Sequence, residues 1–159
     1  MLAKGTYYKR TLGSAPTSSS QIGYTDTTIL ATSPAISNNT VTSMLTTITY
    51  PPGVWLITYQ ATVYFATAPS SFLTFSTYLS GPTGGSLGGL TQFGKLMTGT
   101  QTLTGINAVT SLSNSMCFNL TSSSAITLYV LVNANASAQA GGANTSNVQG
   151  TYITATRIG

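Results

Sequence analysis

Trp55-Leu56-Ile57-Thr58-Tyr59-Gln60-Ala61-Thr62-Val63-Tyr64-Phe65 is a stretch in which two kinds of residue alternate. Every second residue from Trp55 to Phe65 is aromatic or aliphatic, and three of the five residues between them are Thr or Gln. Successive side chains of a β-strand point to opposite faces of a sheet. A period of two held over this length therefore predicts one long strand with a single buried face.

Segments with related patterns lie on both sides of this strand. Pro51-Pro52-Gly53 predicts a turn before it, and residues 41–50 alternate ahead of that turn. Further strands are predicted at residues 72–79, 116–120, 126–132 and 148–158, with weaker β segments at 92–97 and 100–109. No segment has a helical period. Roughly eight to ten short strands joined by Gly, Pro, Ser and Asn turns predict an all-β, antiparallel β-sandwich, and a single jelly roll is the common form at this size.

The chain divides into two parts. Residues 1–33 are expected to form an extended N-terminal arm with a flexible tract at Thr17-Ser18-Ser19-Ser20, and residues 22–30 can add a short strand. Residues 34–159 are expected to form the jelly-roll domain, with the loops 81–90 and 133–147 facing outward. A chain of 159 residues suits one such domain.

The near-absence of ionisable side chains argues against an enzyme. Asp26 is the only acid, and the chain has neither Glu nor His. Positioned acids, bases and metal ligands carry most enzyme mechanisms, and one carboxylate without an imidazole supplies neither a carboxylate pair nor a transition-metal site. We therefore predict no catalytic residue, no metal and no cofactor.

The polar residues are mainly hydroxyl side chains. Ser and Thr make up 50 of the 159 residues, whereas charged residues make up 4%. Long charged side chains normally protect β proteins from edge-to-edge association. The composition therefore predicts that other subunits cover much of the surface, and we assign Tyr59, Tyr152 and Arg157 as candidate subunit-interface residues.

Most of the positive charge lies near the N-terminus. Lys4, Lys9 and Arg10 are interleaved with Tyr7 and Tyr8. These five residues are interpreted as an assembly arm. A basic, aromatic segment can also contact nucleic acid, but no basic stripe occurs elsewhere, so a nucleic-acid-binding domain is not expected.

The single cysteine and the apolar runs indicate in which compartment the chain folds. Cys117 lies in the apolar run Met116-Cys117-Phe118 and is expected to be buried. No signal peptide is recognised, and the longest apolar run, residues 126–132, is too short to span a bilayer. The chain is therefore expected to fold in a reducing compartment and, if it leaves a cell, to travel as part of a particle.

Two segments resemble a known family. Pro51-Pro52-Gly53-Val54-Trp55-Leu56-Ile57, followed by Tyr59 and Val63, resembles the start of a central strand in C1q/TNF-like jelly rolls. Tyr152-Ile153-Thr154-Ala155-Thr156-Arg157-Ile158-Gly159 is similar to the last strand of such domains in phages and large DNA viruses. The resemblance covers about residues 40–159. It implies a ten-strand sandwich that assembles as a trimer, often as a spike, fibre head or decoration on a particle.

Composition, fold and resemblance together predict a non-enzymatic virion structural protein. It is expected to form homo-oligomers, trimers before pentamers, to contact other capsid proteins, and to meet a host-surface receptor or glycan. A pentameric or minor capsid building block is one alternative, and a carbohydrate-binding adhesin module is another.

Overall fold

The computed structural model describes residues 16–65, 73–80, 91–92, 95–103, 109–133, 138–140 and 150–159. Within these ranges every regular element is a β-strand. The strands are β1 (Thr25–Ile29), β2 (Ala35–Ile36), β3 (Thr42–Thr46), β4 (Gly53–Phe65), β5 (Leu73–Ser80), β6 (Thr91–Gln92), β7 (Lys95–Leu103), β8 (Val109–Leu120), β9 (Thr127–Asn133), β10 (Ala138–Ala140) and β11 (Tyr152–Arg157). No helix that could cross a membrane is found in this part of the chain.

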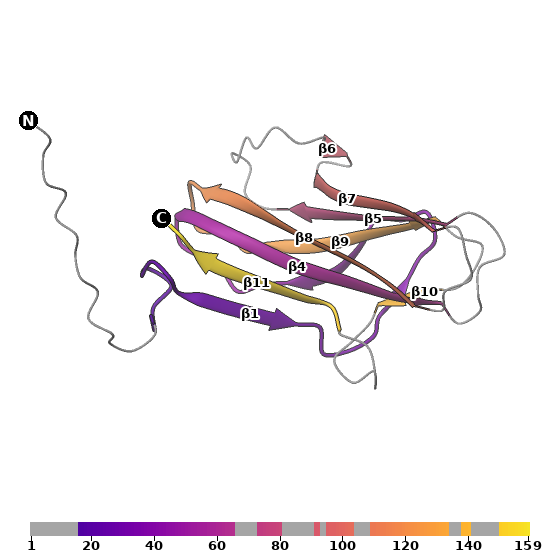
Figure 1. Ribbon diagram of the computed structural model, residues 1–159, viewed down its shortest axis with the longest axis horizontal. Coiled ribbons are helices and arrows are strands. Elements are labelled where there is room, and N and C mark those ends of the chain that lie inside the picture. Colours follow the sequence, from indigo (N-terminus) through magenta and orange to yellow (C-terminus); the bar gives the residue numbers. More distant parts are fainter. Residues whose placement is uncertain are drawn as a thin grey trace, which may run out of the picture.

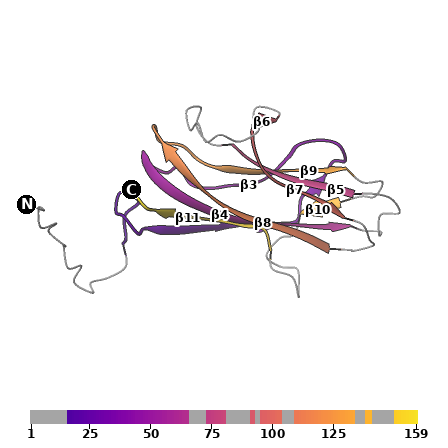
Figure 2. The ribbon, with the colours of Figure 1, turned by 45° about the horizontal axis from the view of Figure 1, so that its top comes forward.

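The strands form two antiparallel sheets that pack face to face (Figures 1 and 2). The first sheet has the order β1-β11-β4-β10-β2, and β8 pairs with the other edge of β4. The second sheet has the order β3-β9-β5-β7-β6. The predicted all-β, antiparallel β-sandwich is therefore confirmed.

The connectivity is that of a jelly roll. Leaving aside the short strands β2, β6 and β10, the first strand pairs with the last, as β1 does with β11. The same nesting continues inward with β3 and β9, β4 and β8, and β5 and β7. Such nested antiparallel pairs, folded over into two sheets, make the double Greek key of a jelly roll.

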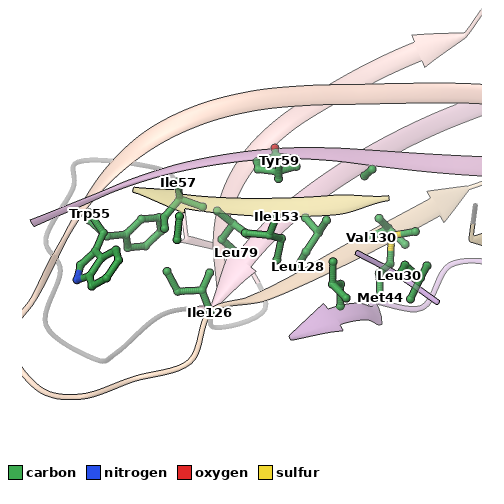
Figure 3. Packing of buried hydrophobic residues seen from close by; sticks show 14 of the residues in the cluster. Leu30, Met44, Trp55, Ile57, Tyr59, Leu79, Ile126, Leu128, Val130 and Ile153 are labelled. Carbon is green, nitrogen blue, oxygen red and sulfur yellow. The ribbon is translucent and has the colours of Figure 1, made fainter. Parts of the chain in front are cut away.

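The long central strand β4 supplies the middle of the core. Trp55, Ile57, Tyr59, Ala61 and Val63 are all fully buried, as their alternation predicts. Buried residues of the facing sheet and of β11 complete this core, among them Phe75, Leu79, Ile126, Leu128, Val130, Val132, Ile153 and Ala155. Figure 3 shows Trp55 at one end of the cluster and Leu30 with Met44 at the other.

Two details differ from a simple alternation. Met44 and Leu45 are adjacent but both buried, because the pairing of β3 with β9 shifts register between Ser43 and Leu45. Such an irregularity redirects side chains that the period of two would send to opposite faces. Ile48, expected on the same face as Met44, lies beyond the end of β3 and is 52% exposed.

Other boundaries also differ from the expectations. β8 begins at Val109, well ahead of the strand predicted at 116–120. β10 lies inside the predicted loop 133–147, and the loop 81–90 falls outside the described residues. β1 lies within the range assigned to the arm and pairs with β11 at the edge of the first sheet. The boundary between arm and domain at residue 33 stays a prediction.

Candidate arm-root and assembly surfaces

One end of the sandwich brings together three distant parts of the chain (Figure 1). Residues 17–24, here called the arm root, precede β1 and hydrogen-bond to β11: Gly23 N donates to Arg157 O at 2.7 Å, and Arg157 N donates to Tyr24 O at 2.9 Å. The C-terminal residue in turn holds the start of β4, where Val54 N donates to Gly159 O at 2.8 Å. Residues 17–24 are thus fastened to the last strand, beside Gly159.

Arg157 occupies the centre of this junction. It follows Ile153 and Ala155 on the inner face of β11, opposite Trp55 of β4. Its Cζ lies 5.7 Å from the centroid of the Trp55 ring, within the range of a cation–π interaction. Nη1 donates to Ser19 O at 3.2 Å. The guanidinium therefore links the arm root to the aromatic end of the core.

Gly53 makes room for that guanidinium. Its φ is +145°, a conformation that side chains disfavour. A Cβ built on Gly53 would lie 2.6 Å from Nη2 of Arg157 and 2.7 Å from the carbonyl oxygen of Gly159. The glycine of the Pro51-Pro52-Gly53 turn is therefore required both by its backbone conformation and by the close approach of Arg157.

Aromatic rings fill the space beneath the arm root. Tyr24 meets Trp55 edge-to-face, with centroids 6.4 Å apart and an interplanar angle of 87°. Tyr50 packs on Trp55 with centroids 4.6 Å apart, and Trp55 Nε1 donates to Pro51 O at 3.1 Å. Aromatic pairs in such arrangements stabilise a fold beyond the contribution of their buried apolar area. Tyr24 is therefore the main apolar anchor of the arm root.

The only acid of the chain belongs to the same end. Asp26 lies on the inner side of β1, opposite Ala155, and its Oδ2 accepts a hydrogen bond from Tyr50 Oη at 2.9 Å. Burial first, and then this carboxylate, raise the pKa of Tyr50 above its usual value. Asp26 thus acts as a hydrogen-bond acceptor that ties β1 to the core. No cluster of His, Cys, Asp or Glu suited to a metal ion occurs among the described residues.

The outer face of the first sheet has a different character. Across β1, β11, β4 and β8 its side chains are hydroxyl, amide, thiol or apolar, and Thr27, Thr154, Thr58 and Ser115 form one row. Within that row Thr27 and Thr154 hydrogen-bond at 3.0 Å, and so do Thr58 and Ser115. The inner-face position of Asp26 and Arg157 leaves this outer face without an acid or a base in the four strands.

The candidate interface residues do not gather at one place. Tyr152 is half-buried on the outer face, between Ile29 and Gln60, whereas Arg157 points to the inner face. Tyr59 is fully buried inside the chain and offers no surface to a second subunit. The arm residues Lys4, Tyr7, Tyr8, Lys9 and Arg10 lie outside the described residues.

Tyr59 instead joins the two sheets. Its hydroxyl lies 2.7 Å from Thr77 Oγ1 and donates to Thr98 Oγ1 at 2.6 Å. Thr98 stands at a register shift between β5 and β7 and donates on to Thr77 O at 3.1 Å. A buried phenol hydroxyl needs hydrogen-bond partners. That of Tyr59 finds them inside the chain and not in a second subunit.

Cys117 was expected to be buried, and that expectation is wrong. The residue is exposed on the outer face, opposite Leu56 of β4. Its neighbour Phe118 points inward and is buried. The alternation of Met116, Phe118 and Leu120 already places Cys117 on the opposite parity, a signal that outweighs the local apolar run.

Comparisons with known proteins give few matches. No protein-family model matches the chain, and no curated protein matches its sequence. Two solved structures align over 86% of the chain. The structure of the infectious bursal disease virus Gx strain has 11% identity and a TM-score of 0.40, and the VP2 subviral particle of infectious bursal disease virus has 14% identity and a TM-score of 0.33. The alignments span 37% and 38% of those chains, so the likeness is weak and partial.

Proposed function

We propose that this chain is a non-enzymatic structural protein of a virus particle. In this proposal copies associate through the outer face of the β1-β11-β4-β8 sheet, and the N-terminal arm tethers each copy to the particle. The observation that carries it is the outer face itself, which spans four strands without an acidic or basic side chain.

The placement of charge supports association through this face. A monomeric β protein normally protects an open sheet with Lys, Arg, Glu or Asp on its solvent side. Asp26 and Arg157 both turn inward, where they hold Tyr50 and the arm root. The outer face instead carries rows of Thr and Ser with Leu56, Tyr152 and Ile29 among them. A neutral face of this kind is suited to burial against another neutral face.

The dimensions of the face are adequate. Strands about 4.8 Å apart that rise about 3.3 Å per residue give four strands of this length a plan area on the order of 600 Å². A standard interface buries ~800 Å² of accessible surface on each partner. Most of the face would therefore be covered in a stable assembly.

The arm root supports the tethering role. Arg157, Tyr24 and Asp26 fix the point at which the arm meets the sandwich. Lys4, Tyr7, Tyr8, Lys9 and Arg10 precede that fixed point by at least seven residues. A pull on the arm would then be transmitted to β11 and β4 rather than to a single edge strand.

The finer assignments belong to the proposal as well. We infer a C1q/TNF-like homotrimer serving as a spike, fibre head or decoration, assembled in the host cytoplasm, with the loops 81–90 and 133–147 available to a receptor or glycan. A pentameric capsid block or a monomeric adhesin would share the fold but differ in stoichiometry.

Light scattering on the purified chain tests the proposal. We expect the mass of a closed oligomer for the parent, and a monomer for Thr58→Lys and Thr154→Lys, which place a charge in the middle of the outer face. Ile48→Lys is the matched control, because Ile48 is exposed but lies outside this face. A monomeric parent would contradict the proposal and direct attention to glycan binding. A pentamer would replace the trimer assignment.

A further inference from the structure

β8 is the longest strand with an unpaired edge in the described part of the chain. One edge pairs with β4 in unbroken register, from Val109 opposite Tyr64 to Leu120 opposite Gly53. No described strand is hydrogen-bonded to its other edge, along which β7 of the facing sheet passes (Figure 2). A hydrogen bond from Asn114 Nδ2 to Thr98 O joins this edge of β8 to the β7 backbone.

The backbone groups on that edge can be assigned. Ser115 N donates to Oδ1 of its neighbour Asn114 at 2.7 Å and not to β4. The backbone groups of successive residues alternate between the two edges of a strand. With the register unbroken, the N–H groups of Ser111, Ser113 and Cys117 therefore point to the same free edge as that of Ser115.

The edge lacks the usual protection against pairing. Natural edge strands carry Lys or Pro, contain bulges or are short. β8 is twelve residues long, reads VTSLSNSMCFNL, and contains no charged residue, proline or glycine. Its pairing with β4 shows no register shift. By its length, shape and composition this edge is able to accept another strand.

Among the described residues, Asn114 places its side chain across this edge. Its Oδ1 occupies the Ser115 N–H, and its Nδ2 donates to Thr98 O of β7. Thr98 is itself buried and hydrogen-bonded to Tyr59 and Thr77. The side chain of Asn114 thus bridges the centre of the free edge to a fixed point on the facing sheet.

We propose that the free edge of β8 is a second association surface, that its partner is the β8 edge of another copy, and that Asn114 keeps it closed. Opening the Asn114 bridge would let two β8 strands pair antiparallel and join two first sheets into one. This inference goes beyond the proposed virion role and does not depend on the outer face.

A second copy fits this edge better than a charged partner does. An antiparallel pair of identical strands is related by a two-fold axis, so the same groups meet on both sides. Like charges directly opposite each other destabilise such pairs, and β8 has none. In a pair centred on Ser113, Ser111 would lie opposite Ser115 of the other copy, and Ser113 would lie opposite Ser113.

The test compares two substitutions at one position, both made in the Thr58→Lys background so that the outer face is already blocked. Asn114→Ala opens the bridge and leaves the edge neutral. Asn114→Lys opens the bridge but places a charge on the edge. We expect Asn114→Ala to raise the weight-average mass about twofold or more with increasing concentration, since each paired edge joins two copies. Asn114→Lys should keep the mass of its Thr58→Lys parent.

Thr47→Val controls for loss of stability. It removes a buried hydroxyl that accepts a hydrogen bond from Ile126 N in the segment between β3 and β4, and it touches neither Asn114 nor its partner Thr98. Association of Asn114→Ala alone supports the proposal. Three results would overturn it: no change in mass for Asn114→Ala, equal association of Asn114→Lys, or equal association of Thr47→Val. If Thr58→Lys keeps the mass of the unmodified chain, the outer-face proposal fails. The test of the β8 edge still holds, because both Asn114 variants are compared with Thr58→Lys itself.

Discussion

Arg157 and Trp55 face each other across β11 and β4, and the guanidinium of Arg157 lies over the indole with its Cζ 5.7 Å from the ring centroid. The same guanidinium bonds to Ser19 O of the arm root. One basic side chain thus connects the buried end of the core with the segment that leads into the N-terminal arm.

Replacing Arg157 should loosen the arm root. A cation–π contact contributes about 0.5–2 kcal/mol and a hydrogen bond from a charged group about 1.5–3 kcal/mol. Because Arg157 is partly exposed, we expect Arg157→Ala to lower the free energy of unfolding by about 1–3 kcal/mol. Urea denaturation measures this loss, and limited proteolysis should show faster cleavage between residues 17 and 24. Unchanged stability and cleavage would refute the link.

Gly53→Ala should be strongly destabilising. The new Cβ would meet Nη2 of Arg157 and the carbonyl of Gly159, at a φ that alanine disfavours. Backbone strain of this kind costs about 1–3 kcal/mol. Gly159→Ala is the matched control, because a Cβ there lies 3.3 Å from Val54 side-chain atoms, without backbone in the way. Thermal melts that rank the two variants equally would show that the space at Gly53 is not limiting.

Stability should fall at alkaline pH through Tyr50. Its pKa is raised in the folded state by burial and by Asp26, from a usual value of 10.0. A raised pKa means that the unfolded chain loses its proton first, so the contribution is complete below about pH 10 and is lost as pH rises further. We expect the free energy of unfolding to decline above that pH, and less steeply in Tyr50→Phe. Part of the decline should remain, because burial also raises the pKa of Tyr59.

Cys117 provides a reporter for the outer face. It is exposed in the single chain and lies opposite Leu56, on the β8 side of the neutral outer face. If copies associate through this face, a thiol reagent should label Cys117 slowly in the oligomer and quickly in Thr58→Lys. Reaction rates followed by absorbance would decide this. Equal rates in the two proteins would place the interface elsewhere.

The alternation of side chains accounts for how much of the fold could be predicted. From Trp55 to Val63 the period of two identified both the strand and its buried face, because an isolated pattern of this length has no other stable arrangement. The same pattern failed between Ser43 and Leu45, where a register shift brings Met44 and Leu45 to one side. A bulge depends on the partner strand, which lies far away in the sequence.

Only part of the candidate site could be predicted from the sequence in this way. Arg157 was singled out because it is a rare charge in the last strand, and its guanidinium donates to Ser19 O of the arm root. Its assignment to a subunit interface stays a prediction. Tyr59 was grouped with it, but its hydroxyl bonds to Thr77 and Thr98 within the core. The pairing of Asp26 with Tyr50 joins residues 24 positions apart, and no local pattern indicates it.

The sequence by itself determined that this is a β-sandwich with a neutral, hydroxyl-rich surface, because strand periodicity and composition are local properties of the chain. The tertiary structure alone decided where Asp26 and Arg157 lie. Nested strand pairing brings β1 against β11 and β11 against β4, which turns Asp26 and Arg157 inward and leaves the outer face uncharged. Contacts between segments more than a hundred residues apart follow from that pairing and cannot be inferred from a local pattern.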